Sequence, residues 1–156
     1  KWMLPVQTQQ TPYSFGDLRC IEEEVVTSSS FGSFPECSFY CKKSTREIFR
    51  KKDYGAKLVV FSKDGMYAVG LSNSGLHKFE SWVIDRKGRT LAANSHGAAP
   101  QRCQWSVSVM REWYDERNPG VEFVISNGHL LDIKVRSCAG PIISLKDVGS
   151  FNKGNY

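Results

Sequence analysis

Three stretches of apolar residues, each divided by a turn that contains glycine, constrain the fold of this chain more than any other feature. They are KLVVFS-KDG-MYAVGL at 57–71, SWVID-RKG-RTLAAN at 81–94 and VEFVI-SNG-HLLDIKV at 121–135. Asp64-Gly65 and Asn127-Gly128 are among the strongest short hairpin signals, because glycine reaches positive φ without steric cost. The sequence therefore predicts three β-hairpins.

Two other segments are predicted to be helical. The first begins at Pro35 and ends near Asp53, with Ser44 as an alternative N-cap for a shorter helix. Its apolar stripe comes from Phe39, Ile48 and Phe49. The second is WSVSVMREWYDERNPG at 105–120, in which apolar residues recur at helical spacing until Asn-Pro-Gly stops the run. Residues 105–109 also alternate as a strand would.

The predicted fold class is α+β: a twisted, mostly antiparallel sheet of three hairpins, with one or two helices packed on one face. Residues 1–16 are expected to be an extended N-terminal arm, and residues 17–156 a single domain. A length of 156 residues supports one domain with its own core. The longest apolar runs span only a few residues, which excludes a membrane-spanning helix.

The net charge of +5 favours an acidic partner, such as RNA, anionic lipid headgroups or an acidic protein surface. Much of the charge lies in one stretch, and the turn of the second hairpin adds two arginines. The candidate binding residues are Lys42, Lys43, Arg46, Arg50, Lys51, Lys52, Arg86 and Arg89. The basic stretch has three interpretations: the solvated face of one helix, a nucleic-acid patch, or a protein-docking face.

The five cysteines form no C-x-x-C pair, and the histidines at 77, 96 and 129 do not complete a zinc spacing. The sequence therefore predicts no metal site and no cofactor. Because five is odd, at least one thiol is free or pairs between chains. One or two structural disulfides are expected, and a chain with all cysteines reduced is the alternative.

Candidate acid–base residues are few. His96 follows a predicted strand and precedes Gly97, a suitable place for a group whose pKa lies near neutrality. His77 and Glu80 lie three apart, which places them on opposite faces of an extended strand. No nucleophile elbow and no phosphate-binding glycine loop is present in the sequence.

The stretch from Ser81 to Cys103 resembles the C-terminal half of small guanyl-specific fungal ribonucleases. The matching pieces are Trp82-Val83-Ile84, Asp85 to Gly88, Leu91-Ala92-Ala93, Ser95-His96-Gly97 and Cys103. The resemblance covers residues 20 to 103 and implies that Cys20 pairs with Cys103. It extends to the ribonuclease-like secreted effectors of plant-pathogenic fungi, which keep that fold and bridge without the catalytic set.

The chain departs from the ribonuclease pattern at the residues that carry the chemistry. The place of the family's arginine falls near Ser81, and the strand expected to supply its glutamate has no outward-pointing acid. His77 and His96 are the residues left to stand for the two histidines. Without the base and the phosphate-stabilising charge, hydrolysis is not expected.

Three functions follow as hypotheses. The first is a secreted binding protein, a virulence effector that engages a host protein or RNA through its basic face. The second is an active endoribonuclease that uses His77, Glu80 and His96, with Arg86 or Arg89 on the phosphate. The third is an intracellular protein-interaction domain cut from a larger viral or bacterial protein.

Overall fold

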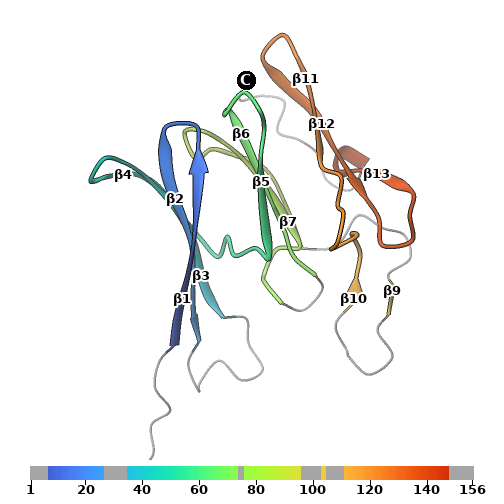
Figure 1. Cartoon of the computed structure of the whole chain (residues 1–156), viewed down its shortest axis with the longest axis horizontal. Helices are drawn as coiled ribbons and strands as arrows, with labels where there is room; N and C mark the ends of the chain where they lie inside the picture. The colour runs from blue at the N-terminus through green and yellow to red at the C-terminus, as the bar shows by residue number, and fades with distance from the viewer. Residues whose placement is uncertain (1–6, 27–34, 74–75, 96–102, 105–110, 148–156) are drawn as a thin grey trace, which may run out of the picture.

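The computed structural model describes residues 7–26, 35–73, 76–95, 103–104 and 111–147, and its regular structure is almost entirely β-strand (Figure 1). The strands are β1 (Gln7–Phe15), β2 (Leu18–Val26), β3 (Glu36–Lys43), β4 (Arg46–Lys52), β5 (Leu58–Phe61), β6 (Tyr67–Leu71), β7 (Ser81–Asp85), β8 (Thr90–Asn94), β9 (Cys103–Gln104), β10 (Arg111–Glu112), β11 (Glu122–Ser126), β12 (His129–Arg136) and β13 (Ile142–Ser144). Within the described ranges the helical structure is one 3₁₀ turn, Leu145–Asp147. The predicted α+β fold class is therefore wrong, because no helix packs on a sheet there.

The three predicted hairpins are confirmed as antiparallel pairs of consecutive strands. β5 pairs with β6, β7 with β8, and β11 with β12. Their turn glycines Gly65, Gly88 and Gly128 have φ angles of 71°, 83° and 75°. This is the left-handed region that glycine enters without a Cβ clash, so the turn chemistry located these hairpins correctly.

The segment predicted as the first helix, 35–53, forms strands β3 and β4 instead. Ser44, with a φ of 57°, lies in the turn between them, where the sequence has no glycine to signal a hairpin. Cys37, Phe39 and Cys41 are buried at every second position of β3, the period of a strand with one face in a core. Tyr40 between them is also buried, and it conceals this alternation in the sequence.

The second predicted helix is also wrong where the structure describes it. Residues 105–110 lie outside the described part, but Arg111–Glu112 is strand β10, paired with β9. Trp113 and Tyr114 follow it in a non-helical segment and are both fully buried. Tyr114 makes an isolated antiparallel bridge to Ser137, so tertiary packing fixes this segment.

Most of the predicted N-terminal arm belongs to a sheet. Gln7–Phe15 is strand β1, and it pairs along its whole length with β2, from Gln7↔Val26 to Phe15↔Leu18. Gly16, with a φ of 61°, makes the turn between the two strands. Residues 7–15 therefore form an edge strand of the sheet β1–β4.

The sheets lie in three layers: β1–β4, then β5–β8, then β11–β13 (Figure 1). One core cluster, which includes Phe39 and Trp82, fills the space between the first two layers. A second cluster, which includes Val83, Trp113 and Ile133, covers the opposite face of the middle layer. All residues of β6 and β7 are buried, as expected for strands covered on both faces.

Two disulfides join the described cysteines, Cys20–Cys41 and Cys103–Cys138, and Cys37 is a buried free thiol. Cys20 and Cys103 are thus both bridged, but the pairing with each other that the resemblance implied is not formed. Cys20 lies directly opposite Cys41 on the neighbouring strand, whereas Cys103 lies near Cys138 through the β9 segment. The disulfides indicate an oxidising compartment. The described residues contain no helix of the length and apolarity needed to cross a membrane.

Candidate functional site

The predicted catalytic residues do not form an accessible group in the described part of the chain. His96 lies outside the described residues. His77 is buried, with Nδ1 2.7 Å from the Ser72 hydroxyl and Nε2 bonded to the Glu24 carboxylate. Glu80, the residue before β7, is also buried. Both nitrogens of His77 are therefore engaged by residues that the ribonuclease interpretation did not include.

A pocket of about 450 Å³ brings together cationic side chains from two hairpins. Lys43 comes from the end of β3, and Arg86, Lys87 and Arg89 come from the β7–β8 turn. Apolar side chains form the other part of the wall: Leu18, Ile48, Met66, Tyr67 and Leu91. The pocket also touches Gly128 and His129 of the β11–β12 hairpin. Three of the predicted binding residues, Lys43, Arg86 and Arg89, thus line one concave surface.

The β7–β8 turn is held by Asp85, which is buried in the pocket wall. One carboxylate oxygen accepts hydrogen bonds from the backbone N–H groups of Lys87 and Arg89, each at 2.9 Å. The other accepts a hydrogen bond from Arg89 Nε at 2.6 Å. These bonds fix the backbone that presents Arg86, Lys87 and Arg89 to the pocket.

The cationic groups stay in contact with solvent. Arg86 pairs with Asp17, and Lys43 lies 3.6 Å from the same carboxylate. The side chains of Lys43, Arg86 and Asp17 are 63%, 34% and 51% exposed, so the two pairs with Asp17 contribute little stability and leave both cations accessible to a ligand. Among the described residues that line the pocket, Asp85 is the one acid, against the four cations Lys43, Arg86, Lys87 and Arg89.

The other predicted basic residues lie along the β3–β4 hairpin and outside this pocket: Lys42, Arg46, Arg50, Lys51 and Lys52. Arg50 covers the ring of Tyr40 at 4.0 Å and pairs with Glu47 at 2.8 Å. Lys51 instead lies 5.1 Å from the ring of Tyr54. Because β4 is a strand, its charges are divided between two faces rather than gathered on one side of a helix.

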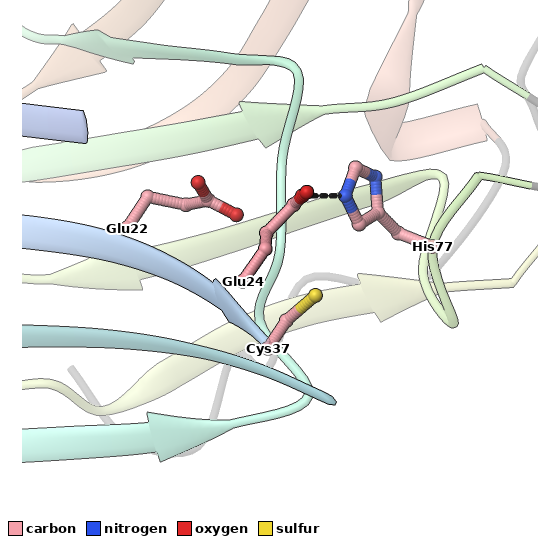
Figure 2. A group of neighbouring side chains, drawn as sticks. All are labelled: Glu22, Glu24, Cys37 and His77. Atoms are coloured by element: carbon pink, nitrogen blue, oxygen red, sulfur yellow. Dashed lines mark hydrogen bonds and ion pairs between the residues drawn. The ribbon is translucent and has the colours of Figure 1, made fainter. Parts of the chain in front are cut away.

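A second group of chemically active side chains lies between the first two layers. Figure 2 shows Glu22 and Glu24 of β2, Cys37 of β3 and His77 turned toward one another. Each offers one nitrogen, oxygen or sulfur atom, and these atoms lie within 4.8 Å of one another. Glu24 is directly opposite Cys37 in the strand register, and Glu22 is two residues away on the same face.

Burial and mutual repulsion set the ionisation of this group. Burial, with the neighbouring charge of Glu24 as a second cause, raises the pKa of Glu22 to about 8. The hydrogen bond from His77 lowers the pKa of Glu24. Burial raises the pKa of the Cys37 thiol to about 12, and the charges of Glu24 and Glu22 add to the increase. The four side chains thus concentrate acidic groups where desolvation opposes negative charge.

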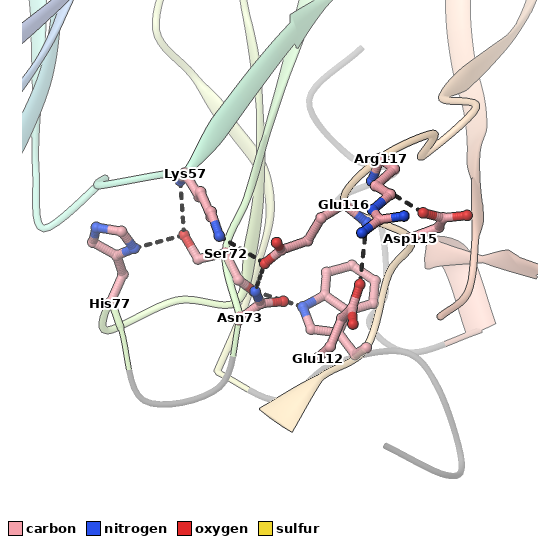
Figure 3. A network of polar contacts seen from close by, with 9 residues as sticks. Lys57, Ser72, Asn73, His77, Glu112, Asp115, Glu116 and Arg117 are labelled. Atoms are coloured by element: carbon pink, nitrogen blue, oxygen red, sulfur yellow. Dashed lines mark hydrogen bonds and ion pairs between the residues drawn. The ribbon is translucent and has the colours of Figure 1, made fainter. Parts of the chain in front are cut away.

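A network of hydrogen bonds fixes His77 through Nδ1, the ring nitrogen that does not contact Glu24 (Figure 3). The Ser72 hydroxyl, bonded to His77 Nδ1, also accepts a hydrogen bond from the Lys57 backbone N–H at 3.3 Å. The Ser72 carbonyl accepts a hydrogen bond from the Trp113 indole at 2.6 Å. His77 is therefore fixed through Ser72 to both the middle layer and the segment after β10.

Sequence reasoning missed Glu22, Glu24 and Cys37. The available signal was the alternation on two strands: Cys20, Glu22 and Glu24 share one face of β2, and Cys37 shares a face with Cys41 on β3. Two glutamates on the cysteine-bearing face of a strand are unusual because that face is buried. The signal required β3 to be recognised as a strand, and it was predicted to be a helix.

Comparison with known proteins finds no family, no curated protein and no solved structure that matches this chain.

Proposed function

We propose that the chain is a secreted binding protein whose ligand is an anionic group with an apolar neighbour, presented by a partner macromolecule. The observation that carries the proposal is the pocket in which Lys43, Arg86, Lys87 and Arg89 surround aliphatic walls. A concave, partly apolar surface with a few convergent charged groups is the usual form of a binding site. The two disulfides agree with secretion, and an effector role belongs to the same proposal.

The arginines support recognition of a phosphate or a carboxylate. A guanidinium donates two parallel hydrogen bonds to such a group, and the β7–β8 turn supplies two guanidinium groups on a backbone that Asp85 fixes. The aliphatic wall of Leu18, Ile48 and Leu91 suits the part of the ligand next to the charge. RNA and an acidic or phosphorylated protein segment both offer this chemistry.

Binding is preferred to RNA cleavage because of the surroundings of His77. A general base must reach its substrate, but His77 is buried and both its ring nitrogens are bonded within the protein. The cationic pocket lies on the β7–β8 turn, whereas His77 precedes β7. The proposal therefore assigns the cations to ligand binding and not to phosphate chemistry.

Fluorescence anisotropy with two labelled probes tests the proposal: a single-stranded RNA oligonucleotide and a phosphorylated acidic peptide. At least one probe is expected to bind, with an affinity that falls as salt increases. Lys87→Glu is expected to weaken that binding by about tenfold or more, since a charge-assisted hydrogen bond contributes about 1.5–3 kcal/mol. The probe that binds identifies the class of partner.

Lys134→Glu on β12 is the matched control, because it makes the same change of charge at an exposed residue outside the pocket. An equal loss of binding in both variants would mean that net charge alone attracts the probe, and the pocket would lose its role. Unlabelled RNA is expected to stay intact when it is incubated with the wild-type protein. Cleavage by the wild-type protein that disappears in His96→Ala would instead favour the ribonuclease alternative.

A further inference from the structure

We propose that Glu22, Glu24, Cys37 and His77 form a zinc-binding site that joins the first sheet of the protein to the middle sheet. The four donors are a thiol, an imidazole nitrogen and two carboxylates, and their atoms lie within 4.8 Å of one another. Thiolate, imidazole and carboxylate together suit Zn²⁺, whereas Ca²⁺ and Mg²⁺ take oxygen ligands. The inference rests on this convergence and is independent of the ligand pocket.

The separations are close to those of a tetrahedral zinc site. Bonds of about 2.0–2.3 Å at tetrahedral angles place neighbouring ligand atoms ~3.3–3.8 Å apart. A contraction of about 1 Å brings the widest pair into this range, and the glutamate side chains have the rotatable bonds to make it. Glu22, Cys37 and His77 are each more than nine-tenths buried, as in a closed structural site rather than an open catalytic one.

The residues behind the ligands are arranged as they are around bound zinc. A metal-bound histidine usually donates its other ring N–H to an oxygen, which fixes the orientation of the ring. His77 Nδ1 lies 2.7 Å from the Ser72 hydroxyl, which leaves Nε2 directed at the carboxylates. The Ala56 backbone N–H donates to Glu22 Oε1 at 3.3 Å and so holds the second carboxylate.

The backbone at Gly55 makes room for this group of side chains. A Cβ atom at this position would lie 2.5 Å from His77 Cδ2 and 2.7 Å from Cys37 Sγ. The chain therefore passes against the imidazole and the thiol at a distance that only glycine permits. This close approach is expected where backbone encloses a compact site.

The acidic side chains of the cluster can bind a cation when they give up their protons to it. Two carboxylates and a thiol converge in a buried space. In the described part of the chain Glu24 pairs with His77, and neither carboxylate pairs with a lysine or arginine. Buried acidic groups are costly unless they are paired or bind a metal. Cys37 is also the one cysteine outside a disulfide, so its thiol is free to lose its proton and bind a metal.

Zinc at this place would link segments far apart in the sequence. Glu22, Glu24 and Cys37 belong to the sheet of β1–β4, and His77 belongs to the connection between β6 and β7 of the middle sheet. A bound metal stabilises the folded state by its binding free energy, because the unfolded chain does not hold the ligands together. The site is therefore expected to raise the melting temperature.

The first test is titration of the full, oxidised chain with Co²⁺ after removal of metals by a chelator. Tetrahedral Co²⁺ bound to Cys37 is expected to give intense visible absorption bands and a thiolate-to-metal charge-transfer band, both abolished by one equivalent of Zn²⁺. A wild-type protein that takes up no Co²⁺, or that shows only the weak bands of octahedral Co²⁺ without charge transfer, would overturn the proposal. This result does not depend on whether any variant folds.

Variants then assign the ligands. Ser72→Ala, which removes the support of His77 but no ligand, is expected to weaken Zn²⁺ binding by about 10–100-fold in calorimetry. Cys37→Ser and Glu22→Gln are expected to weaken it further. Glu36→Gln is the matched control, since Glu36 is exposed on β3 beside Cys37 and lies on the opposite face. Unchanged binding in Cys37→Ser and Glu22→Gln, or an equal loss in Glu36→Gln, would place the metal elsewhere.

Discussion

Trp82 illustrates how single residues determine the spacing of the first two layers. The side chain is fully buried, and its indole N–H donates to the Gly55 carbonyl at 2.9 Å. Its ring packs against those of Phe39 and Tyr54, with centroids 5.1 and 5.4 Å away. The indole lies directly over Gly70 on the neighbouring strand, so the absence of a side chain at residue 70 is what lets it fit.

Gly70→Ala is predicted to destabilise the fold because its Cβ would lie 2.1 Å from Trp82 Cε2. The indole is held by a hydrogen bond and by its aromatic neighbours, so it cannot move away cheaply. The expected loss is about 1–3 kcal/mol or more, measured by urea denaturation. Gly128→Asn is the control, since a Cβ there meets nothing within 4 Å and asparagine tolerates positive φ. Equal losses in the two variants would contradict the proposed clash.

At the scale of elements, the two disulfides differ in accessibility. Cys20–Cys41 joins the paired strands β2 and β3, and both of its cysteines are buried, at 1% and 0% exposure. Cys103–Cys138 joins β9 to the turn that follows β12, and both of its cysteines are only partly buried. The first bridge is therefore enclosed by the core between two layers, and the second lies nearer to solvent.

A soluble phosphine added to the native protein is predicted to open Cys103–Cys138 before Cys20–Cys41, because reduction needs access to sulfur. Alkylation followed by mass spectrometry identifies which cysteines become labelled over time. Labelling of Cys20 and Cys41 first would contradict this order.

The variant with Cys20→Ala and Cys41→Ala is expected to lose about 2–4 kcal/mol of stability, the usual effect of removing a disulfide.

The hairpins that the sequence predicted have glycine in their turns, but the β1–β2 hairpin, which turns at Gly16, was not predicted. The hairpins around Gly65, Gly88 and Gly128 were predicted because their turns require a positive φ, which favours glycine, and glycine is visible in the sequence. The β3–β4 hairpin turns at Ser44, so no glycine indicates the turn. Its basic residues are equally compatible with one face of a helix. Trp113 and Tyr114 end a run of apolar residues with helical spacing, but burial against the middle layer determines their conformation.

The sequence predicted the candidate sites only in part, because it shows which residues are charged but not which of them meet in the fold. Lys43, Arg86 and Arg89 were chosen for their charge, and charge is visible without knowledge of the fold. Their meeting in one pocket depends on two hairpins from different sheets, which periodicity does not report. The cluster of Glu22, Cys37 and His77 depends on strand register and on the packing of layers, so ligand spacing along the chain could not reveal it.

At the scale of the whole molecule, Trp113 connects the third layer to the middle one. Its side chain is fully buried in the second core cluster, and its indole N–H donates to the Ser72 carbonyl at 2.6 Å. Lys57 and Asn73 add contacts to Glu116, which follows shortly after Trp113 in the chain (Figure 3). Apolar packing therefore joins these layers, and polar contacts fix the segment between β10 and β11 to the middle layer.

Trp113→Phe is predicted to destabilise the whole protein by about 1–3 kcal/mol, because it keeps an aromatic ring but leaves the buried Ser72 carbonyl without this donor. Thermal unfolding followed by far- and near-ultraviolet circular dichroism is expected to show one transition at a lower temperature. Two separate transitions would mean that the third layer melts alone, which would contradict a continuous core. Phe79→Leu is the comparison for the loss of stability, because Phe79 is a partly buried aromatic residue outside the second core cluster.

The middle sheet touches core on both sides, which limits where this protein can change its sequence. A substitution in β6 or β7 must satisfy two sets of neighbours at once, whereas the solvent-facing residues of β1 and β4 have few neighbours to satisfy. New surface properties can therefore arise on the outer strands and on the turns without cost to folding. A chain built in this way can keep its interior constant while the residues that meet a partner diverge.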